Sequence, residues 1–169
     1  SIDAGASVER GVYVGGVNFK QKDFSIGAIN YFSDDIINIF YTEAKYALPL
    51  GKETKLKLAA QYSDQQSTGD ELLTGTAFST SQWGVKADLG LGAALLTLAY
   101  TDTASGADMQ SPWSGYPGYT SVQVQDFNRA GEEAAIVKVG VDLCKALDLA
   151  GMSTYALWVH GWDRSAGPN

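Results

Sequence analysis

The sequence predicts an all-β protein in which about eight strands follow one another as antiparallel hairpins. Three observations predict this fold: apolar and polar residues alternate with a period of two, the alternating segments are long, and the connections alternate in length. Residues 55–62 show the alternation, because an apolar set and a polar set interleave there: Leu56, Leu58, Ala60 and Tyr62 against Lys55, Lys57, Ala59 and Gln61. A helix would not separate the two sets so cleanly.

The alternation extends through eight segments, which we expect to be strands: residues 7–20, 23–33, 35–48, 54–66, 77–89, 92–104, 132–145 and 150–163. At about 11–15 residues each, they exceed the five or six residues typical of strands in soluble proteins. A tilted strand that crosses a membrane needs roughly 9–11 residues in the hydrocarbon. Strand length therefore favours a transmembrane β-barrel over the alternative of a soluble sandwich.

The connections between these strands indicate that the sheet has two different ends. The first, third, fifth and seventh are short, at residues 20–23, 49–53, 90–91 and 146–149. The fourth and sixth are long, at residues 64–76 and 101–131, whereas the second, at 33–34, is short. Because consecutive connections lie at opposite ends of a meander, both long ones fall at one end. Outer-membrane barrels have short periplasmic turns and long extracellular loops.

Composition and charge exclude several classes of function. The net charge of −7 argues against nucleic-acid binding, which needs a basic surface. Cys144 and His160 are the only cysteine and histidine, so an internal disulfide is impossible and we expect neither a metal site nor a cofactor. His160 suggests a hydrolytic triad, but no nucleophile elbow accompanies it, and the alternation groups it with Ala156 and Trp158 in a lumen-directed pattern. We therefore predict that the protein is not an enzyme.

The two faces of the predicted sheet differ in character. The polar face, which we expect to line a lumen, carries few charges: Glu43, Lys45, Lys55, Lys57, Lys86, Asp88, Lys138 and Asp142. The apolar face has aromatic residues near the strand ends, namely Tyr46, Tyr62, Trp83 and Tyr100. Such residues form girdles at the edges of a membrane, so we expect outer-membrane lipid, or detergent, to cover this face.

The long connection at about residues 102–132 is the segment most indicative of function. From Asp102 to Glu133 it holds five acidic residues and one basic residue, Arg129. A long loop in a compact domain is usually functional or disordered. Its aromatic residues, Trp113, Tyr116, Tyr119 and Phe127, favour an ordered loop that folds inward.

At residues 121–132, Ser-Val-Gln-Val-Gln-Asp-Phe-Asn-Arg-Ala-Gly-Glu, the chain resembles the OprD-type porins. The loop motif of that family is Ser, two spacers, Tyr, one spacer, Asp-Phe-Asn, and then Gly-Glu. Residues 12–20 and 39–50 also resemble hairpins of the family. The resemblance implies a channel in the outer membrane of Gram-negative bacteria, through which small carboxylates or amino acids diffuse passively past an acidic loop.

The resemblance also implies roles for individual residues. Asp126 is the candidate carboxylate for the cationic end of a substrate, and Ser121 is its hydrogen-bonding neighbour. Val124 stands where the family often has Tyr, so one aromatic or hydroxyl contact is missing. Two alternatives stay open: Asp126 caps the loop ahead of Phe127, and Arg129 pairs with Glu132 or Glu133 instead of contacting substrate.

The number of strands departs from the family pattern. The family barrel has eighteen strands, whereas residues 1–169 supply about eight as a single barrel segment. We therefore expect a segment of a larger barrel, or a truncated relative, that pairs with the remaining strands or with another chain. The alternative is a small soluble eight-stranded barrel that binds an apolar ligand.

Overall fold

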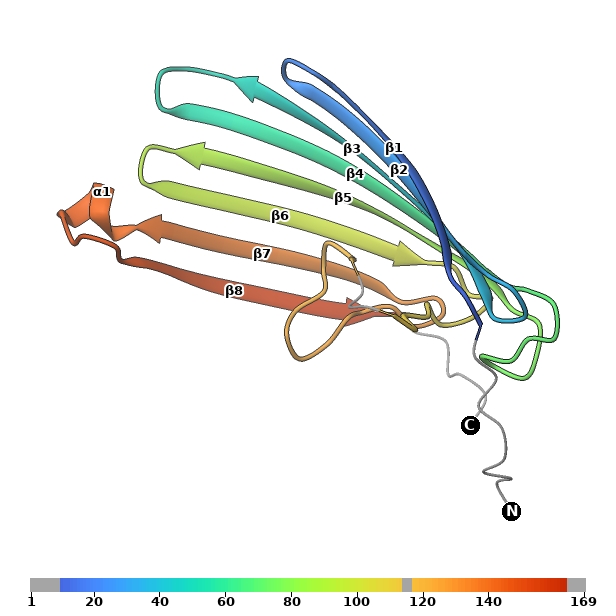
Figure 1. The fold of residues 1–169 in the computed structure, drawn as a ribbon. Coiled ribbons are helices and arrows are strands. Elements are labelled where there is room, and N and C mark those ends of the chain that lie inside the picture. Colours follow the sequence, from blue (N-terminus) through green and yellow to red (C-terminus); the bar gives the residue numbers. More distant parts are fainter. Residues whose placement is uncertain (1–9, 114–116, 164–169) are drawn as a thin grey trace.

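The protein forms one antiparallel sheet whose eight strands lie in sequence order (Figure 1). The computed structural model describes residues 10–113 and 117–163. The strands are β1 (Tyr13–Gln21), β2 (Phe24–Ser33), β3 (Ile37–Pro49), β4 (Thr54–Ser67), β5 (Ser79–Leu91), β6 (Ala94–Thr103), β7 (Glu133–Asp142) and β8 (Ser153–Trp162). The meander and its eight strands confirm the predicted fold. The expected start of the first strand, at residue 7, lies outside the described residues.

Tight turns join the strands at one end of the sheet. Lys22 and Asp23 connect β1 to β2, and Gly92 and Ala93 connect β5 to β6. Lys22 and Gly92 have positive φ angles, 49° and 57°, as the favoured two-residue hairpin turns require. Residues 50–53 connect β3 to β4 at the same end.

The seventh connection differs from the prediction. Strand β7 ends at Asp142, and a short helix, α1 (Leu143–Leu147), follows where the sequence suggested that the strand continues to residue 145. The Asp142 side chain accepts hydrogen bonds from the backbone N–H groups of Cys144 and Lys145, which caps the helix. Asp148 ends the helix in the left-handed conformation. Apolar and polar residues continue to alternate past Asp142, so the sequence pattern did not reveal that Asp142 caps a helix.

The remaining connections gather at the other end of the sheet (Figure 1). They comprise residues 34–36, 68–78 and 104–132. The fourth connection begins later than expected, because residues 64–67 extend β4 and pair with β3. The predicted asymmetry between the two ends is confirmed, apart from the ten-residue seventh connection.

Alternation along the strands gives the sheet two faces. We call the face against which residues 104–132 pack the loop face, and the other the opposite face. Cross-strand partners share a face, so the register places whole rows of side chains together. One row of the loop face runs through Lys45, Ala59 and Lys86. A row of the opposite face runs through Tyr46, Leu58 and Ala87.

Buried side chains concentrate beneath the loop. Among the described residues, the buried apolar ones are Ile37, Ala99, Met109, Phe127, Ala130, Ala134 and Ile136. Many large apolar residues remain exposed because a single sheet has no second layer to cover its opposite face. A soluble monomer rarely exposes so extensive an apolar surface. Within the described part of the chain, no helix is both long and apolar enough to cross a membrane.

The described sheet is open, with β1 and β8 at its two edges. A small soluble barrel that encloses an apolar ligand needs these edges to pair. The structure therefore contradicts the closed eight-stranded alternative. An unpaired edge is a liability that a larger barrel removes by pairing it with a further strand.

Candidate functional site: a loop packed over a lysine-rich strand face

The loop formed by residues 104–132 is held against β4 and β5 by side chains of the strands. Gln65 on β4 forms two hydrogen bonds with Gln110: its Nε2 donates to the Gln110 carbonyl at 2.9 Å, and its Oε1 accepts from the Gln110 N–H at 2.7 Å. Thr80 on β5 donates to the Ala107 carbonyl at 2.6 Å. Gln82 donates to the Phe127 carbonyl at 3.3 Å. These contacts hold the loop against the sheet; Tyr116, one of the aromatic residues on which the prediction of an inward fold rested, lies outside the described residues.

A buried pair of hydroxyl groups fixes the middle of the loop to β6. The Oγ1 atoms of Thr101 and Thr120 lie 2.5 Å apart, and both residues are 0 % exposed. Because water cannot reach them, each hydroxyl depends on the other for its hydrogen bond. This contact sets the depth at which residues 118–121 sit over the sheet.

The neighbouring loop residue, Tyr119, contacts two charged side chains of the loop face, Glu43 and Lys86, and the first of these pairs with Lys45. Its hydroxyl donates to Glu43 Oε1 at 2.7 Å, while Lys45 Nζ lies 2.7 Å from Glu43 Oε2. Lys86 Nζ lies 4.7 Å from the centre of the Tyr119 ring, a cation–π contact. Burial, and then the hydrogen bond to Glu43, raises the pKa of Tyr119 above its ordinary value, so its hydroxyl remains a donor.

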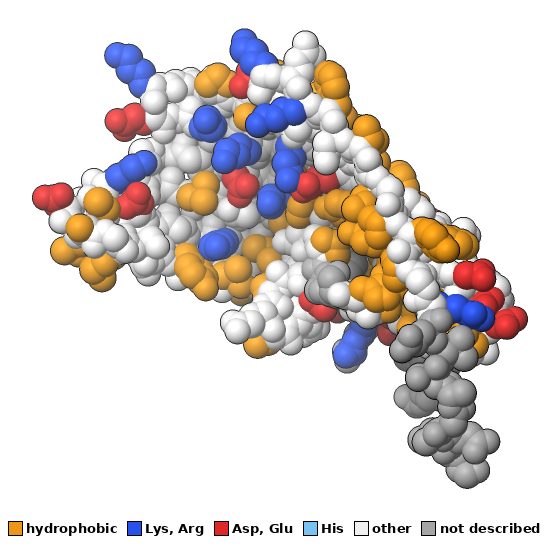
Figure 2. All heavy atoms as spheres, viewed as in Figure 1, with side chains coloured by type: hydrophobic (Ala, Val, Ile, Leu, Met, Phe, Trp, Pro, Cys, Tyr) orange, Lys and Arg blue, Asp and Glu red, His pale blue; other side chains and the backbone are white. Residues whose placement is uncertain are grey.

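Lysines gather on the loop face between the loop and the tight turns (Figure 2). A hollow of about 480 Å³ is lined by Lys20, Lys22, Lys45, Lys55, Lys57 and Lys86, with Asp23 and Asp88 the acidic residues among them. Asp88 lies opposite Lys57 in the register and accepts a hydrogen bond from Thr97 at 2.5 Å. Lys138 lies farther along the sheet, 4.4 Å above the ring of Tyr155. The excess of lysine makes this hollow electropositive.

The tip of the loop contains the predicted carboxylate. Ser121 Oγ donates to Asp126 Oδ1 at 2.5 Å, and Val122 and Gln125 bridge as in a small hairpin. Asp126 is half-buried, and no partner for its Oδ2 occurs among the described residues. Val124 is 91 % exposed at the tip. The structure thus brings Ser121 and Asp126 together and leaves one carboxylate oxygen available.

The structure does not support the alternative in which Arg129 forms an ion pair with Glu132 or Glu133. The backbone N–H of Arg129, rather than its guanidinium, donates to Glu132 Oε2 at 3.0 Å. The side chain is exposed, and within residues 10–113 and 117–163 it forms no ion pair. Glu132 itself is buried, as is Phe127. Both side chains lie against Gly161, where an added Cβ atom would meet them. The loop is therefore braced by Glu132 and not by the charge of Arg129.

A second hollow, of about 430 Å³, separates the start of the loop from β2 and β3. Tyr31, Ile39 and Tyr41 line it from the strands, and Trp113 lines it from the loop. The Tyr31 and Trp113 rings stack with their centres 6.4 Å apart. Apolar contacts thus anchor this part of the loop against β2 and β3.

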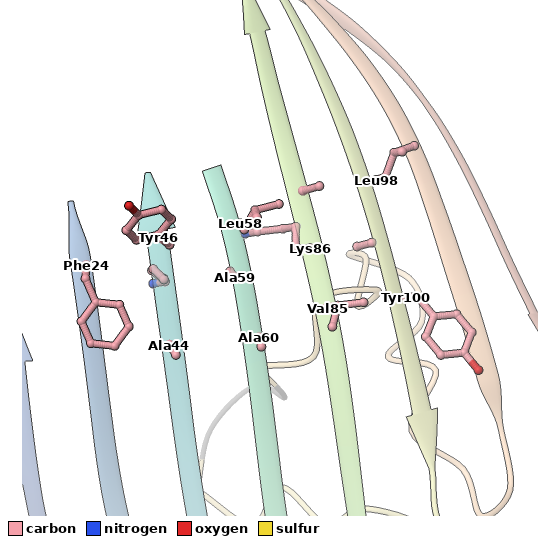
Figure 3. Close-up of a pocket in the computed structure, with 13 residues that line it drawn as sticks. Phe24, Ala44, Tyr46, Leu58, Ala59, Ala60, Val85, Lys86, Leu98 and Tyr100 are labelled. Atoms are coloured by element: carbon pink, nitrogen blue, oxygen red, sulfur yellow. The ribbon is translucent and has the colours of Figure 1, made fainter. Parts of the chain in front are cut away.

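The opposite face has a different chemistry. Ala44 and Ala60 form the floor of a shallow apolar hollow of about 590 Å³, bordered by Phe24, Tyr46 and Tyr100 (Figure 3). The hollow results from small residues among large ones, and its side chains offer little for binding a polar solute. Its position on the uncovered apolar surface is what a lipid-facing wall requires.

His160 also lies on this opposite face, which corrects the expectation that it points toward the lumen. Its ring stacks between Trp158 and Trp162, at 5.9 and 6.0 Å, and Trp162 in turn contacts Tyr100. Gly161, the next residue, faces the loop instead. Within the part of the chain that the structure describes, no group of three or more His, Cys, Asp or Glu residues could hold a metal ion.

The predicted charges of the polar face share one surface. Lys55, Lys57, Lys86, Asp88 and Lys138 alternate with apolar residues that occupy the opposite face. The sequence placed Glu43 and Lys45 on the same face but gave no sign that Glu43 contacts the loop. The Tyr119–Glu43 hydrogen bond joins residues 76 positions apart, and no pattern in the sequence marks that pairing.

The decisive comparison is with protein families. The sequence profile of the OprD family of outer membrane porins matches residues 3–168, nearly the whole chain. The chain belongs to the OprD family. This places it in the bacterial outer membrane and agrees with the apolar opposite face. The family is one of channel-forming porins, a class that is not enzymatic in general. No curated protein matches the chain.

Solved structures share this fold at low sequence identity. OpdL of Pseudomonas aeruginosa superposes with a TM-score of 0.86 at 18% identity, over 93% of this chain and 44% of that one. The outer membrane protein OprD of the same organism gives 0.81 at 20%, over 89% and 39%. OccAB1 of Acinetobacter baumannii gives 0.83 at 16%, over 91% and 42%. The chain therefore spans less than half of the length of each of these porins.

Proposed function

We propose that the loop face lines part of a pore through which small carboxylates or amino acids diffuse passively. The observation that carries this proposal is the position of the acidic loop beside a lysine-rich hollow of a porin sheet, which the loop meets where Tyr119 contacts Lys86. In porins the apolar strand face meets lipid and the polar face meets water. The full-length protein would supply the strands that complete the wall.

The arrangement suits a solute that carries a carboxylate. The lysines of the hollow attract the carboxylate, and charge-lined clefts raise the local concentration of an oppositely charged solute. In this proposal the available oxygen of Asp126 faces the ammonium group of an amino acid. Ser121 holds the Asp126 carboxylate in place by its hydrogen bond to the other oxygen. Arg129 is the weakest of the proposed contacts, because only its exposure supports it.

Planar-bilayer recording of the full-length protein tests the lysine hollow. Replacing Lys57 and Lys86 together by Gln should lower the anion-to-cation permeability ratio at low salt, because two positive charges leave the lumen. Replacing Lys52 and Lys145 together by Gln is the control of equal charge change, since both lie in connections between strands and outside the hollow. An unchanged ratio in the double variant, or an absence of channels in the unmodified protein, would refute the proposal.

The role of Asp126 needs a separate variant. Asp126→Asn should weaken current block by a basic amino acid such as lysine and leave block by acetate unchanged, because only the ammonium end loses its partner. Asp70→Asn, in the other long connection, is the control of equal charge change. Equal effects of the two variants would leave Asp126 with the alternative role of a loop brace.

A further inference from the structure

We infer that Glu43 is a specificity-determining residue, because its single carboxylate both holds the loop through Tyr119 and offsets the charge of Lys45. This inference rests on the proposed pore and adds to it a carboxylate on the wall, distinct from the one at the loop tip. Glu43 Oε1 accepts from Tyr119 at 2.7 Å, and Oε2 lies 2.7 Å from Lys45 Nζ.

The position of Glu43 places it between the loop and the lysines. In the register it lies opposite Gln61, one row above the row of Lys45, Ala59 and Lys86. Lys86 faces the ring of the same Tyr119. Glu43, Lys45, Lys86 and Tyr119 therefore form one connected group, which we call the latch.

Exposure distinguishes the members of the latch. The Glu43 side chain is 22% exposed, while that of Lys45 is 55% exposed. A solute carboxylate entering the hollow thus reaches Lys45 from the open side, but it competes there with Glu43, which already neutralises that lysine. Glu43 accordingly lowers the affinity of the upper lysines for anions, so that a bound solute can leave. Conduction needs binding that is weak enough for release.

Two variants of the full-length protein separate the two tasks of Glu43. Glu43→Gln removes the charge and retains an acceptor for Tyr119, so the anion-to-cation permeability ratio should rise roughly two- to five-fold in dilute KCl. Because salt screens such charges, the rise should largely vanish in 1 M KCl. Tyr119→Phe keeps every charge and removes the hydrogen bond. Its ratio should stay unchanged, while open-channel noise and hydrogen exchange of residues 117–126 increase.

Glu53→Gln serves as the charge-matched control, because Glu53 lies in the turn between β3 and β4. A Glu43→Gln ratio equal to that of the unmodified protein, or no larger a change than in Glu53→Gln, overturns the inference and reduces Glu43 to a loop anchor. A failure of the proposed pore is distinguishable from this result. In that case the unmodified protein itself shows no selective conductance, whereas hydrogen exchange in Tyr119→Phe still reports on the anchor.

Discussion

Replacing Thr120 by Val should release the middle of the loop from the sheet. The change keeps the shape of the side chain but removes the hydroxyl that lies 2.5 Å from that of Thr101, in a site where both residues are 0 % exposed. A buried polar group left without its partner costs about 1–3 kcal/mol. If the cost falls on the docked loop, its opening becomes roughly 5- to 150-fold more frequent.

Hydrogen exchange of the full-length protein in detergent measures that opening at the backbone amides of Ser121 and Val122. Both are hydrogen-bonded within the loop, to the carbonyls of Gly118 and Gln125. Thr101→Val should produce a similar loss of protection. The double variant should be close to the unmodified protein, because it leaves no hydroxyl unpaired. Additive losses in the double variant would refute the reasoning, and so would full protection in either single variant.

Three further predictions follow from the packing, the two faces and the pKa of Tyr119. Gly161→Ala should destabilise the docked loop by about 1–3 kcal/mol, because the added Cβ would lie 2.6 Å from the ring of Phe127. Hydrogen exchange of the loop should therefore become faster in this variant. Gly140→Ala, whose Cβ would meet its neighbours at 3.8 Å or more, should leave hydrogen exchange unchanged. Val137→Arg should lower the unfolding free energy in bilayers by about 2–4 kcal/mol near the midplane, because it places a charge on the lipid-facing side. Lys138→Arg, on the loop face, should leave the unfolding free energy unchanged. Equal denaturant midpoints for the two variants would contradict the assignment of faces. Because the folded pKa of Tyr119 is raised, the stabilisation from its hydrogen bond is complete below the unfolded pKa and is lost only as pH rises through the higher folded value. Ultraviolet titration should therefore show the same tyrosinate absorbance near pH 10 in Tyr119→Phe as in the unmodified protein, and a smaller signal in the variant would contradict this.

The strands and their faces could be predicted because the signal is local. Alternation with a period of two is visible among neighbouring residues. The face to which each side chain points is the same whichever strand pairs with it. The same locality explains the error at residues 143–145. Asp142 caps a helix of one turn, which is too short to show a helical period, so strand alternation was extended through it.

The contacts that dock the loop could not be predicted in this way. Tyr119 and Glu43 are 76 positions apart, and Gln65 and Gln110 are 45 apart. Their pairing depends on the register of several strands and on the path of the loop, neither of which any short window contains. The face of His160 was predicted wrongly for a different reason. Alternation along β8 was correct, but the sequence does not show which of its two sets of residues faces the loop, and it is the set that contains Gly161.

The central claim, that the loop face lines a water-filled pore, is tested most directly by thiol accessibility. Lys57 and Leu58 are adjacent on β4 and lie on opposite faces. Each is changed to Cys in a full-length Cys144→Ser background and treated with a charged, membrane-impermeant thiol reagent during bilayer recording. We predict that the reagent changes the conductance of Lys57→Cys and leaves Leu58→Cys unaffected. Modification of Leu58→Cys alone, or an equal response in both, would contradict the account.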